Sequence, residues 1–360
     1  MRPSGLGDKD GGDGDPAQSP ADGGALARAG AYRISDKAFF LSLIIAATVL
    51  PLLFVPFAAP IRGAHGGIDD VFRLLLLMST MHVGLTSFFY LDTEYRGHVA
   101  KHAGFYIFLP VAVILAAGAT TYFFAAAGVT YLQLFYHAWL LFHYGRQNYG
   151  VLAFTAGATG SGRPSVLERL ALHLAPIGGI LGANQVFAHF SASIFAPYLE
   201  LSVRAGAALT IAAIALAVLS ALKQILNRTS IWRPLMVVML SLFYLPTFYF
   251  DNYMQVVMGY AIAHALQYFV FMFFLAAGAR WAAPGRAIVV LGLGALATWG
   301  IILLTREDAI WGPILPFVTG AALGLIMWHF ILDAGFWRLS QPWQRERVRE
   351  RFSFLFAQGR

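Results

Sequence analysis

The chain has 360 residues, of which 58% are hydrophobic and only 12% are charged. Soluble domains usually carry about 25% charged residues, so this composition excludes an ordinary soluble fold. The net charge of +7 would suggest nucleic acid as the partner of a soluble protein, but in a membrane protein topology explains it better, and we expect no nucleic-acid partner. The chain contains no cysteine, which excludes disulfides, thiolate metal sites and cysteine nucleophiles.

The first 34 residues are rich in glycine, aspartate, proline and serine. Such a segment buries too little apolar surface to fold, so we expect residues 1–34 to be a disordered tail. The first apolar stretch begins only after this tail and has the length of a full membrane span, which predicts an anchor rather than a cleaved signal peptide. We expect the transmembrane domain to cover residues 35–340.

Ten apolar stretches follow, each close to the roughly 20 residues that a helix needs to cross a bilayer. They lie at about 38–59, 70–91, 102–126, 130–150, 166–190, 203–226, 231–250, 253–277, 285–305 and 313–338. The sequence APIGGILGANQ interrupts the fifth stretch, which can be one helix or two shorter pieces, and nine spans remain an alternative. We therefore predict an all-α, polytopic helical bundle of about ten transmembrane helices.

Lysine and arginine residues indicate how this bundle is oriented. If the N-terminus lies inside, ten basic residues fall in the cytoplasmic loops and four in the opposite loops, with five more in residues 1–37 and six in residues 337–360. Basic residues favour the cytoplasmic side. We expect a multi-pass protein, in a bacterial inner membrane, with both termini in the cytoplasm.

Residues 341–360 form a basic tail in which aromatic residues alternate with arginines. Its arginines include Arg345, Arg347, Arg349 and Arg351, and its aromatic residues include Trp343, Phe352, Phe354 and Phe356. This mixture suits an amphipathic segment that lies on an anionic membrane surface. The alternative is a solvated tail that only enforces the topology.

The histidines are the main candidates for a functional site. An ionisable side chain inside a membrane span is costly unless it is paired or faces an internal cavity, so each one suggests function. Given the expected orientation, most of them lie between the membrane midplane and the cytoplasmic face. We predict as candidate metal ligands His82, His98, His102, His143, His264 and His329. For His65, His173 and His189 we expect a structural role.

Several of these histidines have a polar residue three or four positions away, on the same helix face. The pairs are His98 with His102, His143 with Gln147, His264 with Gln267, and His329 with Asp333. A metal-bound imidazole needs an acceptor at its second nitrogen, and the two glutamines and the aspartate are predicted for that role or as further ligands. His137 lies six residues before His143, about 120° away around the helix, so it faces a neighbouring helix or a second metal. Each histidine can instead simply hydrogen-bond between helices.

The sequence HVAKH, residues 98–102, resembles the HxxxH motif of membrane histidine-box enzymes, the fatty-acid desaturases, hydroxylases and alkane hydroxylases. The HxxHH box of those families, which bind two irons, is missing. Single histidines on separate spans are similar to the bacterial membrane carotenoid-cleaving dioxygenases, which bind one iron. The resemblance implies non-haem iron chemistry on a hydrophobic chain, without assigning a role to any one residue.

We therefore expect a metal-dependent membrane oxidoreductase, a hydroxylase, desaturase or dioxygenase, with one or two irons. Imidazole nitrogens with oxygen ligands suit iron. Its partners would be a membrane lipid or hydrophobic small-molecule substrate and an electron-donor protein. One alternative is a transporter in which the histidines relay protons or metal ions. Another is a haem b electron-transfer protein with axial histidines such as His143 and His264.

Overall fold

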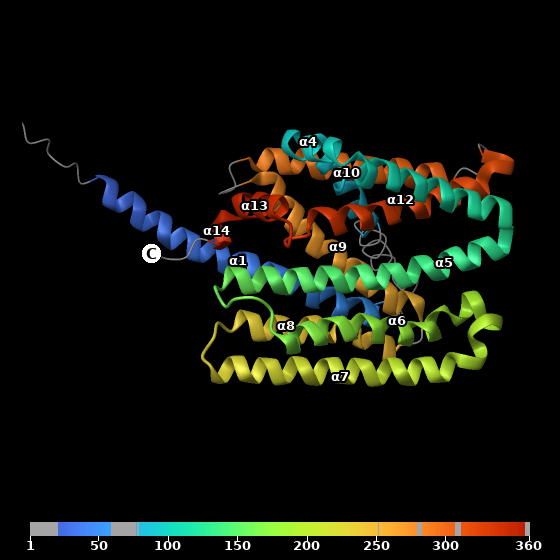
Figure 1. The fold of residues 1–360 in the computed structure, drawn as a ribbon, viewed down its shortest axis with the longest axis horizontal. Coiled ribbons are helices and arrows are strands. Elements are labelled where there is room, and N and C mark those ends of the chain that lie inside the picture. The colour runs from blue at the N-terminus through green and yellow to red at the C-terminus, as the bar shows by residue number, and fades with distance from the viewer. Residues whose placement is uncertain are drawn as a thin grey trace, which may run out of the picture.

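The computed structural model describes residues 21–58, 77, 79–250, 252–278, 283–306 and 311–356. Within these ranges every regular element is a helix, as the composition predicts (Figure 1). The long helices are α1 (Ala21–Ala58), α5 (Leu109–Ala158), α6 (Val166–Phe195), α7 (Leu199–Leu226), α9 (Tyr253–Ala277), α10 (Pro284–Arg306) and α12 (Leu315–Phe336). The shorter ones are α3 (Phe88–Leu91), α4 (Thr93–Lys101), α8 (Trp232–Leu242), α13 (Pro342–Arg351) and α14 (Ser353–Phe356).

The N-terminal tail differs from the expectation of disorder over residues 1–34. Residues 1–20 lie outside the described part of the chain, but from Ala21 onward the chain is already helical. The sequence ALARA supplies alanine, leucine and arginine, which are the strongest helix formers. Propensity and continuity with the apolar part of α1 therefore outweigh the polar composition in residues 21–34.

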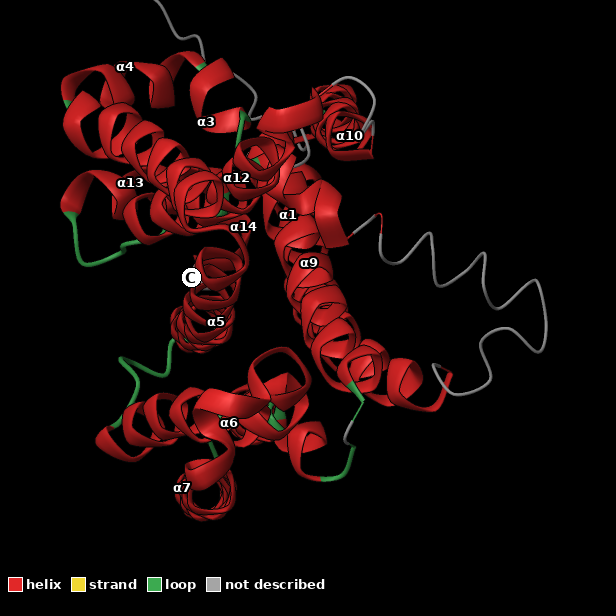
Figure 2. Ribbon diagram, turned by 90° about the vertical axis from the view of Figure 1, so that its right-hand side faces the viewer, coloured by secondary structure: helices red, strands yellow, loops and turns green. Residues whose placement is uncertain are grey.

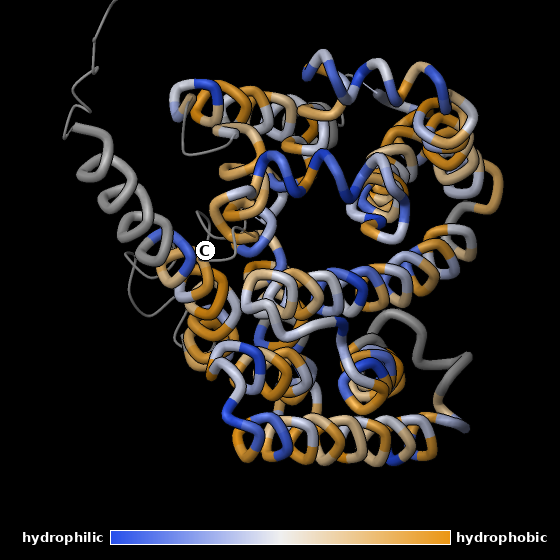
Figure 3. Tube along the Cα trace, turned by 60° about the vertical axis from the view of Figure 1, so that its left-hand side comes forward, coloured by the Kyte–Doolittle hydropathy of each residue, from blue (hydrophilic) through white to orange (hydrophobic). Residues whose placement is uncertain are grey.

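Seven segments of the described chain are helices long and apolar enough to cross a membrane. They are Asp36–Phe57, Gly104–Phe124, Val166–Val186, Ala196–Leu226, Gln255–Ala277, Pro284–Ile301 and Gly312–Phe336. Figure 3 shows hydrophobic residues along most of α7, and the side chains of Leu201, Ile211 and Leu226 there are well exposed. Outward-facing apolar side chains of this kind suit contact with lipid. The chain is thus a helical protein with seven candidate membrane spans.

The expected count of about ten spans is not confirmed. The stretch 130–150 is helical, but its polar side chains keep it out of this set. The stretch 231–250 forms only a shorter apolar helix, Trp232–Phe248. The first part of the stretch 70–91 lies outside the described residues, and the rest is helical at 79–85 before a turn leads into α3. By contrast, residues 166–190 form one helix, α6, despite Pro176 in its interior.

Helix α5 is not one straight rod. Figure 1 shows that the chain reverses direction within it, so that its two arms correspond to the expected spans 102–126 and 130–150. A Cβ on Gly128 would meet the carbonyl oxygen of Thr120. In a straight helix, residues eight positions apart lie about 12 Å apart. The absence of a Cβ at Gly128 therefore allows the close contact between the arms near the reversal.

Helix α12 packs against both arms of α5. On the first arm, a Cβ on Gly320 would meet the carbonyl of Ala117, and one on Gly324 would lie 2.6 Å from the Cα of Ile114. On the second arm, the ring of Phe330 stacks on that of Tyr136 at 6.2 Å. Small residues four apart let helix backbones approach closely within membranes. The pair Gly320 and Gly324 thus fixes the depth at which α12 sits beside α5.

The second arm of α5 is the centre of the molecule. In Figure 2, α6 and α7 lie on one side of it, α12 lies on the other, and α1 and α9 run alongside. A Cβ on Gly84 would clash with the backbone of Gly294 in α10, so two glycines allow the helix at 79–85 to press against α10. This contact fixes the position of residues 79–85, which matters for His82.

The C-terminal segment packs into the protein. Phe352 and Phe354 are buried, and their rings contact Phe40 of α1 at 5.9 Å and 6.1 Å. Phe352 also contacts Phe154 of α5 at 5.0 Å. The expectation that the aromatic residues of this tail lie on a membrane surface is wrong for Phe352 and Phe354, because the ends of α1 and α5 offer an aromatic surface on which both rings become buried.

Candidate metal centre

Four helical segments bring four histidine rings together in the interior. His82 comes from residues 79–85, His143 from the second arm of α5, His264 from α9 and His329 from α12. The ring centre of His82 lies 4.8 Å from those of His264 and His329, and the ring centre of His143 lies 4.8 Å from that of His264 and 5.1 Å from that of His329. All four are buried, with His329 fully inaccessible.

This spacing agrees with what one metal ion imposes on its ligands. With a metal–nitrogen distance of about 2.1 Å and a ring centre roughly 1.1 Å behind the nitrogen, neighbouring imidazoles on one ion have ring centres about 4.5–5.3 Å apart. The four neighbouring distances of 4.8–5.1 Å fall in that interval, and the longer His264–His329 distance is 6.0 Å. The rings are therefore placed as four ligands around a shared point.

The nitrogen atoms that face this point have no hydrogen-bond partner among the described residues. They are the Nε2 atoms of His82, His143 and His329 and both ring nitrogens of His264, all buried. Buried polar atoms in folded proteins are almost always hydrogen-bonded, and exceptions need a reason. A metal ion that binds the lone pairs of these nitrogens would explain why several buried nitrogens without a hydrogen-bond partner lie in one place.

The opposite ring nitrogens of two histidines are held in place. The Nδ1 atom of His82 donates to the carbonyl oxygen of Ser79, one turn earlier. The Nδ1 atom of His329 lies 2.7 Å from the hydroxyl oxygen of Thr86. When Nδ1 carries the proton, Nε2 keeps its lone pair for a metal. Ser79 and Thr86 therefore select the tautomer that the centre needs.

A chain of hydrogen bonds continues from Thr86 to a carboxylate. The hydroxyl of Tyr268 donates to Oδ1 of Asp333 at 2.9 Å, and the hydroxyls of Thr86 and Tyr268 are 3.3 Å apart. Because Tyr268 uses its one hydroxyl proton for Asp333, it accepts from Thr86, and Thr86 in turn accepts from Nδ1 of His329. This order agrees with a proton on Nδ1 of His329.

Asp333 lies on the ligand side of the rings. Its Oδ2 atom is 3.5 Å from Nε2 of His329 and 3.7 Å from Nε2 of His143. Both imidazoles are neutral when Nε2 keeps its lone pair, so neither supplies a positive charge to Asp333. A buried carboxylate is stabilised by a nearby cation. The predicted role of holding the second nitrogen of His329 is performed by Thr86, while Asp333 is placed to contact the metal or a molecule bound to it.

Two groups of potential metal ligands occur in the described part of the chain. One is His82, His264 and His329, and the other is His143, His329 and Asp333, each with ligand atoms within 4.8 Å of one another. His329 belongs to both groups and has only Nε2 available, because Nδ1 contacts Thr86. One nitrogen serves one ion, so the two groups together describe a single centre.

The two predicted glutamines do not contact the histidine rings. The side-chain amide of Gln147 donates to the backbone carbonyl of His264 at 3.0 Å and to the side-chain oxygen of Gln267 at 2.8 Å. Gln267 in turn donates to the hydroxyl of Thr48 at 2.7 Å. These bonds connect α5, α9 and α1 directly beside the centre, so the glutamines position its helices and are not ligands in this geometry.

The structure does not bring His98, His102 or His137 into the cluster. His98 and His102 lie beside each other, and His98 stacks on Trp343 at 3.9 Å. Burial, with the nearby His102 and Lys101, lowers the pKa of His98 to about 4. The Nδ1 atom of His137 lies 2.7 Å from the carbonyl of Gln133 in its own helix. Their proposed role as metal ligands therefore has no support from their positions.

Among the remaining histidines, His173 is the one whose side chain the structure describes, and it belongs to no metal group. His173 is exposed and bonds to the carbonyl of Arg169, as expected for a structural residue. His65 lies outside the described residues, and so does the side chain of His189.

Sequence reasoning missed Ser79 and Thr86. Both were detectable as polar neighbours of His82, because Ser79 precedes it by three residues and Thr86 follows it by four. Their partner atoms were not detectable, since Thr86 contacts a histidine 243 positions away.

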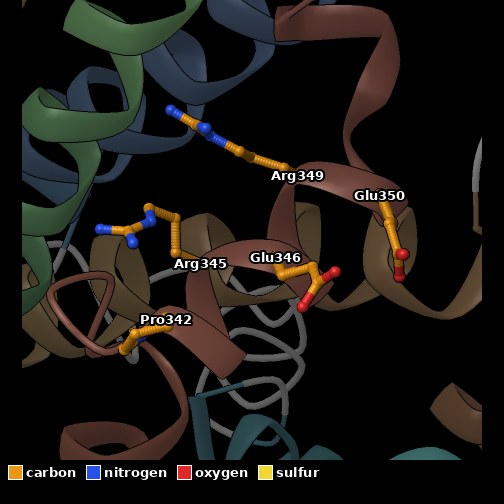
Figure 4. Close-up of a pocket in the computed structure, with 5 residues that line it drawn as sticks. All are labelled: Pro342, Arg345, Glu346, Arg349 and Glu350. Carbon is orange, nitrogen blue, oxygen red and sulfur yellow. The ribbon is translucent and has the colours of Figure 1, made fainter.

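A surface hollow beside α13 is lined by none of the clustered histidines. It is an open depression of about 520 Å³ beside α13, lined by Pro342, Arg345, Glu346, Arg349 and Glu350. In Figure 4 the two arginines extend to one side of the helix and the two glutamates to the other. No histidine is among its lining residues, so it is separate from the candidate metal centre.

No protein-family model, curated protein or solved structure matches this chain.

Proposed function

We propose that this protein is an integral membrane, metal-dependent oxidoreductase that acts on a hydrophobic substrate and uses one non-haem iron. The ligands would be His82, His143, His264 and His329. The observation that carries this proposal is the convergence of buried, unpartnered imidazole nitrogens at the spacing of one coordination sphere.

The donor set suits a redox metal. Imidazole nitrogens favour iron, copper, zinc and nickel, whereas sites for magnesium and calcium consist of oxygen ligands. Four neutral imidazoles with one carboxylate nearby carry a single negative charge, which a divalent ion outweighs. Iron held in this way would react with dioxygen and transfer single electrons. An electron-donor protein would then be a partner.

The surrounding residues are placed to protect such chemistry. Tyr144 and Phe330 cover His264 and His143 with their rings, at 4.5 Å and 4.4 Å. Burial of this kind excludes water from reactive species. The hydroxyl of Tyr268, hydrogen-bonded to Asp333, holds a proton at the edge of the centre. We infer that this pair supplies or accepts the proton that accompanies each electron.

The two alternatives have less support. A haem would have to stand between two axial rings, whereas the rings of His143 and His264 are in contact at 4.8 Å. A hydrogen-bonded chain of the kind a proton relay needs runs from His329 through Thr86 and Tyr268 to Asp333. It does not include the inward nitrogens of the cluster, which have no hydrogen-bond partner within the described residues. The spacing therefore favours a single ion.

The site of action follows from the same proposal. Seven apolar helices among the described residues favour a membrane location. Two cytoplasmic termini, which the distribution of basic residues favours, need an even number of spans, so that part of the proposal requires one further span. A hydrophobic substrate would then reach the centre from the bilayer.

Elemental analysis and absorption spectroscopy of the purified protein test the proposal. We expect about one iron per chain and no Soret band. A strong Soret band in proportion to protein would support the haem alternative, and protein prepared without chelators that contains no transition metal would refute the proposed centre.

A further inference from the structure

A second cavity lies next to the histidine cluster. It has a volume of about 280 Å³ and is partly open, between the helix at 79–85, the second arm of α5, α10 and α12. Pockets for small ligands usually measure about 300–1,000 Å³, so this one is large enough for part of a chain-like molecule. Its walls are mostly aliphatic and come from helices with apolar spans.

The inner end of the cavity is close to the metal centre. Val83, which is buried, lines it and directly follows His82 in the chain. Ile326 lines it too and precedes His329 by three residues, or about 4.5 Å along the helix axis. Residues three apart share a helix face. A molecule in the cavity therefore lies within one helical turn of two proposed ligands.

The outer end of the cavity is polar but uncharged. Thr319 is exposed and lies near the start of α12, and Gln133 lies near the start of the second arm of α5. Among the described residues that line the cavity there is no lysine, arginine, aspartate or glutamate. A carboxylate or phosphate would lose its hydration here without gaining a cationic partner, which is unfavourable. Hydroxyl and amide groups instead suit a neutral polar group.

From this arrangement we infer that the cavity binds the substrate, and that the substrate is an uncharged long-chain molecule with a neutral polar end group. Its polar end would lie near Thr319 and Gln133, and its hydrocarbon chain would point toward Val83 and Ile326. This inference rests on the proposed function, because it is the nearby metal centre that makes the bound molecule a substrate.

Photolabelling tests the inference directly. The probes are a long-chain alcohol with a diazirine in its chain and the matching carboxylate, added to the purified protein and mapped by mass spectrometry of the labelled peptides. We expect the alcohol to label the peptides that contain Val83 and Ile326, and the carboxylate to label them at least tenfold less. Equal labelling by both probes would overturn the assignment to an uncharged ligand.

Substitutions that place a larger side chain in the cavity, with one control outside it, test whether the probe binds there. Ala322 lines it, and Ala322→Phe should abolish labelling of these peptides, with Ala322→Leu giving a smaller reduction in case the larger residue prevents folding. Ala297 is exposed on α10 beside Thr298 and does not line the cavity, so Ala297→Phe should label as the unmodified protein does. Labelling that persists in both Ala322 variants would show that the probe binds elsewhere.

Metal content separates this inference from the proposed function. We expect iron to remain in Ala322→Leu while labelling falls, because the variant fills the cavity without touching the histidines. If the purified protein contains no metal but the alcohol probe still labels the cavity, the cavity binds lipid and the bound molecule is not a substrate. Iron without selective labelling would retain the proposed centre and refute the cavity.

Discussion

At the scale of single residues, the protein keeps unpaired polar atoms where they are most costly. His264 is almost completely buried, and neither ring nitrogen has a hydrogen-bond partner among the described residues. Leaving a buried polar group unsatisfied costs about 1–3 kcal/mol. The cost recurs at His82, His143 and His329, so the apoprotein should gain stability from any ion that satisfies these nitrogens.

Substitution of one histidine should therefore remove the metal. We expect His264→Ala to lose most bound iron, measured by elemental analysis, because one of four imidazole ligands is deleted. His98→Ala and His102→Ala are matched controls, since their rings belong to neither metal group. Both should keep the iron content of the unmodified protein. Loss of iron in the controls would locate the centre at HVAKH instead.

Thr86 should matter for metal affinity although it is not a ligand. Thr86→Val keeps the shape of the side chain but removes the acceptor for Nδ1 of His329. Losing such a partner typically weakens metal binding about 10–100-fold, which a titration with iron or cobalt would measure. Thr155→Val is the control, because the Thr155 hydroxyl bonds only within its own helix, to Val151. Similar affinities in the two variants would contradict this role.

At the scale of elements, helices α1, α5 and α9 are joined by one polar network. Gln147 donates to Gln267, and Gln267 donates to Thr48. Hydrogen bonds between helices inside membranes contribute about 0.6 kcal/mol on average and up to roughly 1.7 kcal/mol. Each such bond is weak, but together they fix the rotation of α9, and with it the direction of His264.

The glutamine pair should therefore show coupled effects. We expect Gln147→Leu and Gln267→Leu each to lower the free energy of unfolding in detergent by about 0.5–2 kcal/mol. The double variant should lose less than the sum of the two, because both substitutions remove the same hydrogen bond. Strictly additive losses would mean that the two side chains act independently.

A second contact between elements depends on pH. His98 of α4 stacks on Trp343 of α13, and its pKa is lowered to about 4 by burial and by nearby His102 and Lys101. The unfolded chain takes up this proton near pH 6.5, so between pH 6.5 and 4 the unfolded state binds more protons. The stability that neutral His98 contributes is thus complete above pH 6.5 and is lost as the pH falls toward 4.

Thermal unfolding followed by tryptophan fluorescence measures this effect. We expect the midpoint to fall between pH 7 and pH 5 in the unmodified protein. The slope should be smaller in His98→Phe, which keeps an aromatic ring against Trp343 but cannot take up a proton. An unchanged slope in this variant would assign the pH dependence to other groups.

At the scale of the whole molecule, the two ends of the chain share one aromatic core. Phe352 is inaccessible and packs against Phe40, Phe154 and Phe271. The C-terminal segment thereby connects helices from the beginning, middle and end of the sequence. Arg351 of the same segment has a side chain only 15% exposed and pairs with the buried Asp92 and with Glu94.

Truncation of Phe352 should destabilise the entire protein. We expect Phe352→Ala to cost about 3–5 kcal/mol of unfolding free energy, the usual range for a buried phenylalanine. Phe108→Ala removes the same side chain from an exposed position and should have a much smaller effect. Metal content per folded molecule should stay constant in both. A small effect at Phe352 would mean that the tail packs only loosely.

The sequence alone determined the helical class, the absence of strands in the described chain and most of the apolar spans. Composition and hydropathy are properties of each segment by itself, so long apolar stretches such as Gln255–Ala277 are recognisable without any partner. The sequence also placed His143, His264 and His329 on such helices, where polar side chains need an explanation.

Only the tertiary structure decided which histidines meet. His82 and His98 were equal candidates in the sequence, yet one ring faces His264 and the other stacks on Trp343. That choice depends on how the helices rotate and how deeply they pack, which glycine contacts and hydrogen bonds between distant segments set. Thr86 contacts His329 across 243 residues for the same reason. Local sequence patterns do not predict which distant residues meet, because segments far apart in the chain come into contact only when the helices pack together.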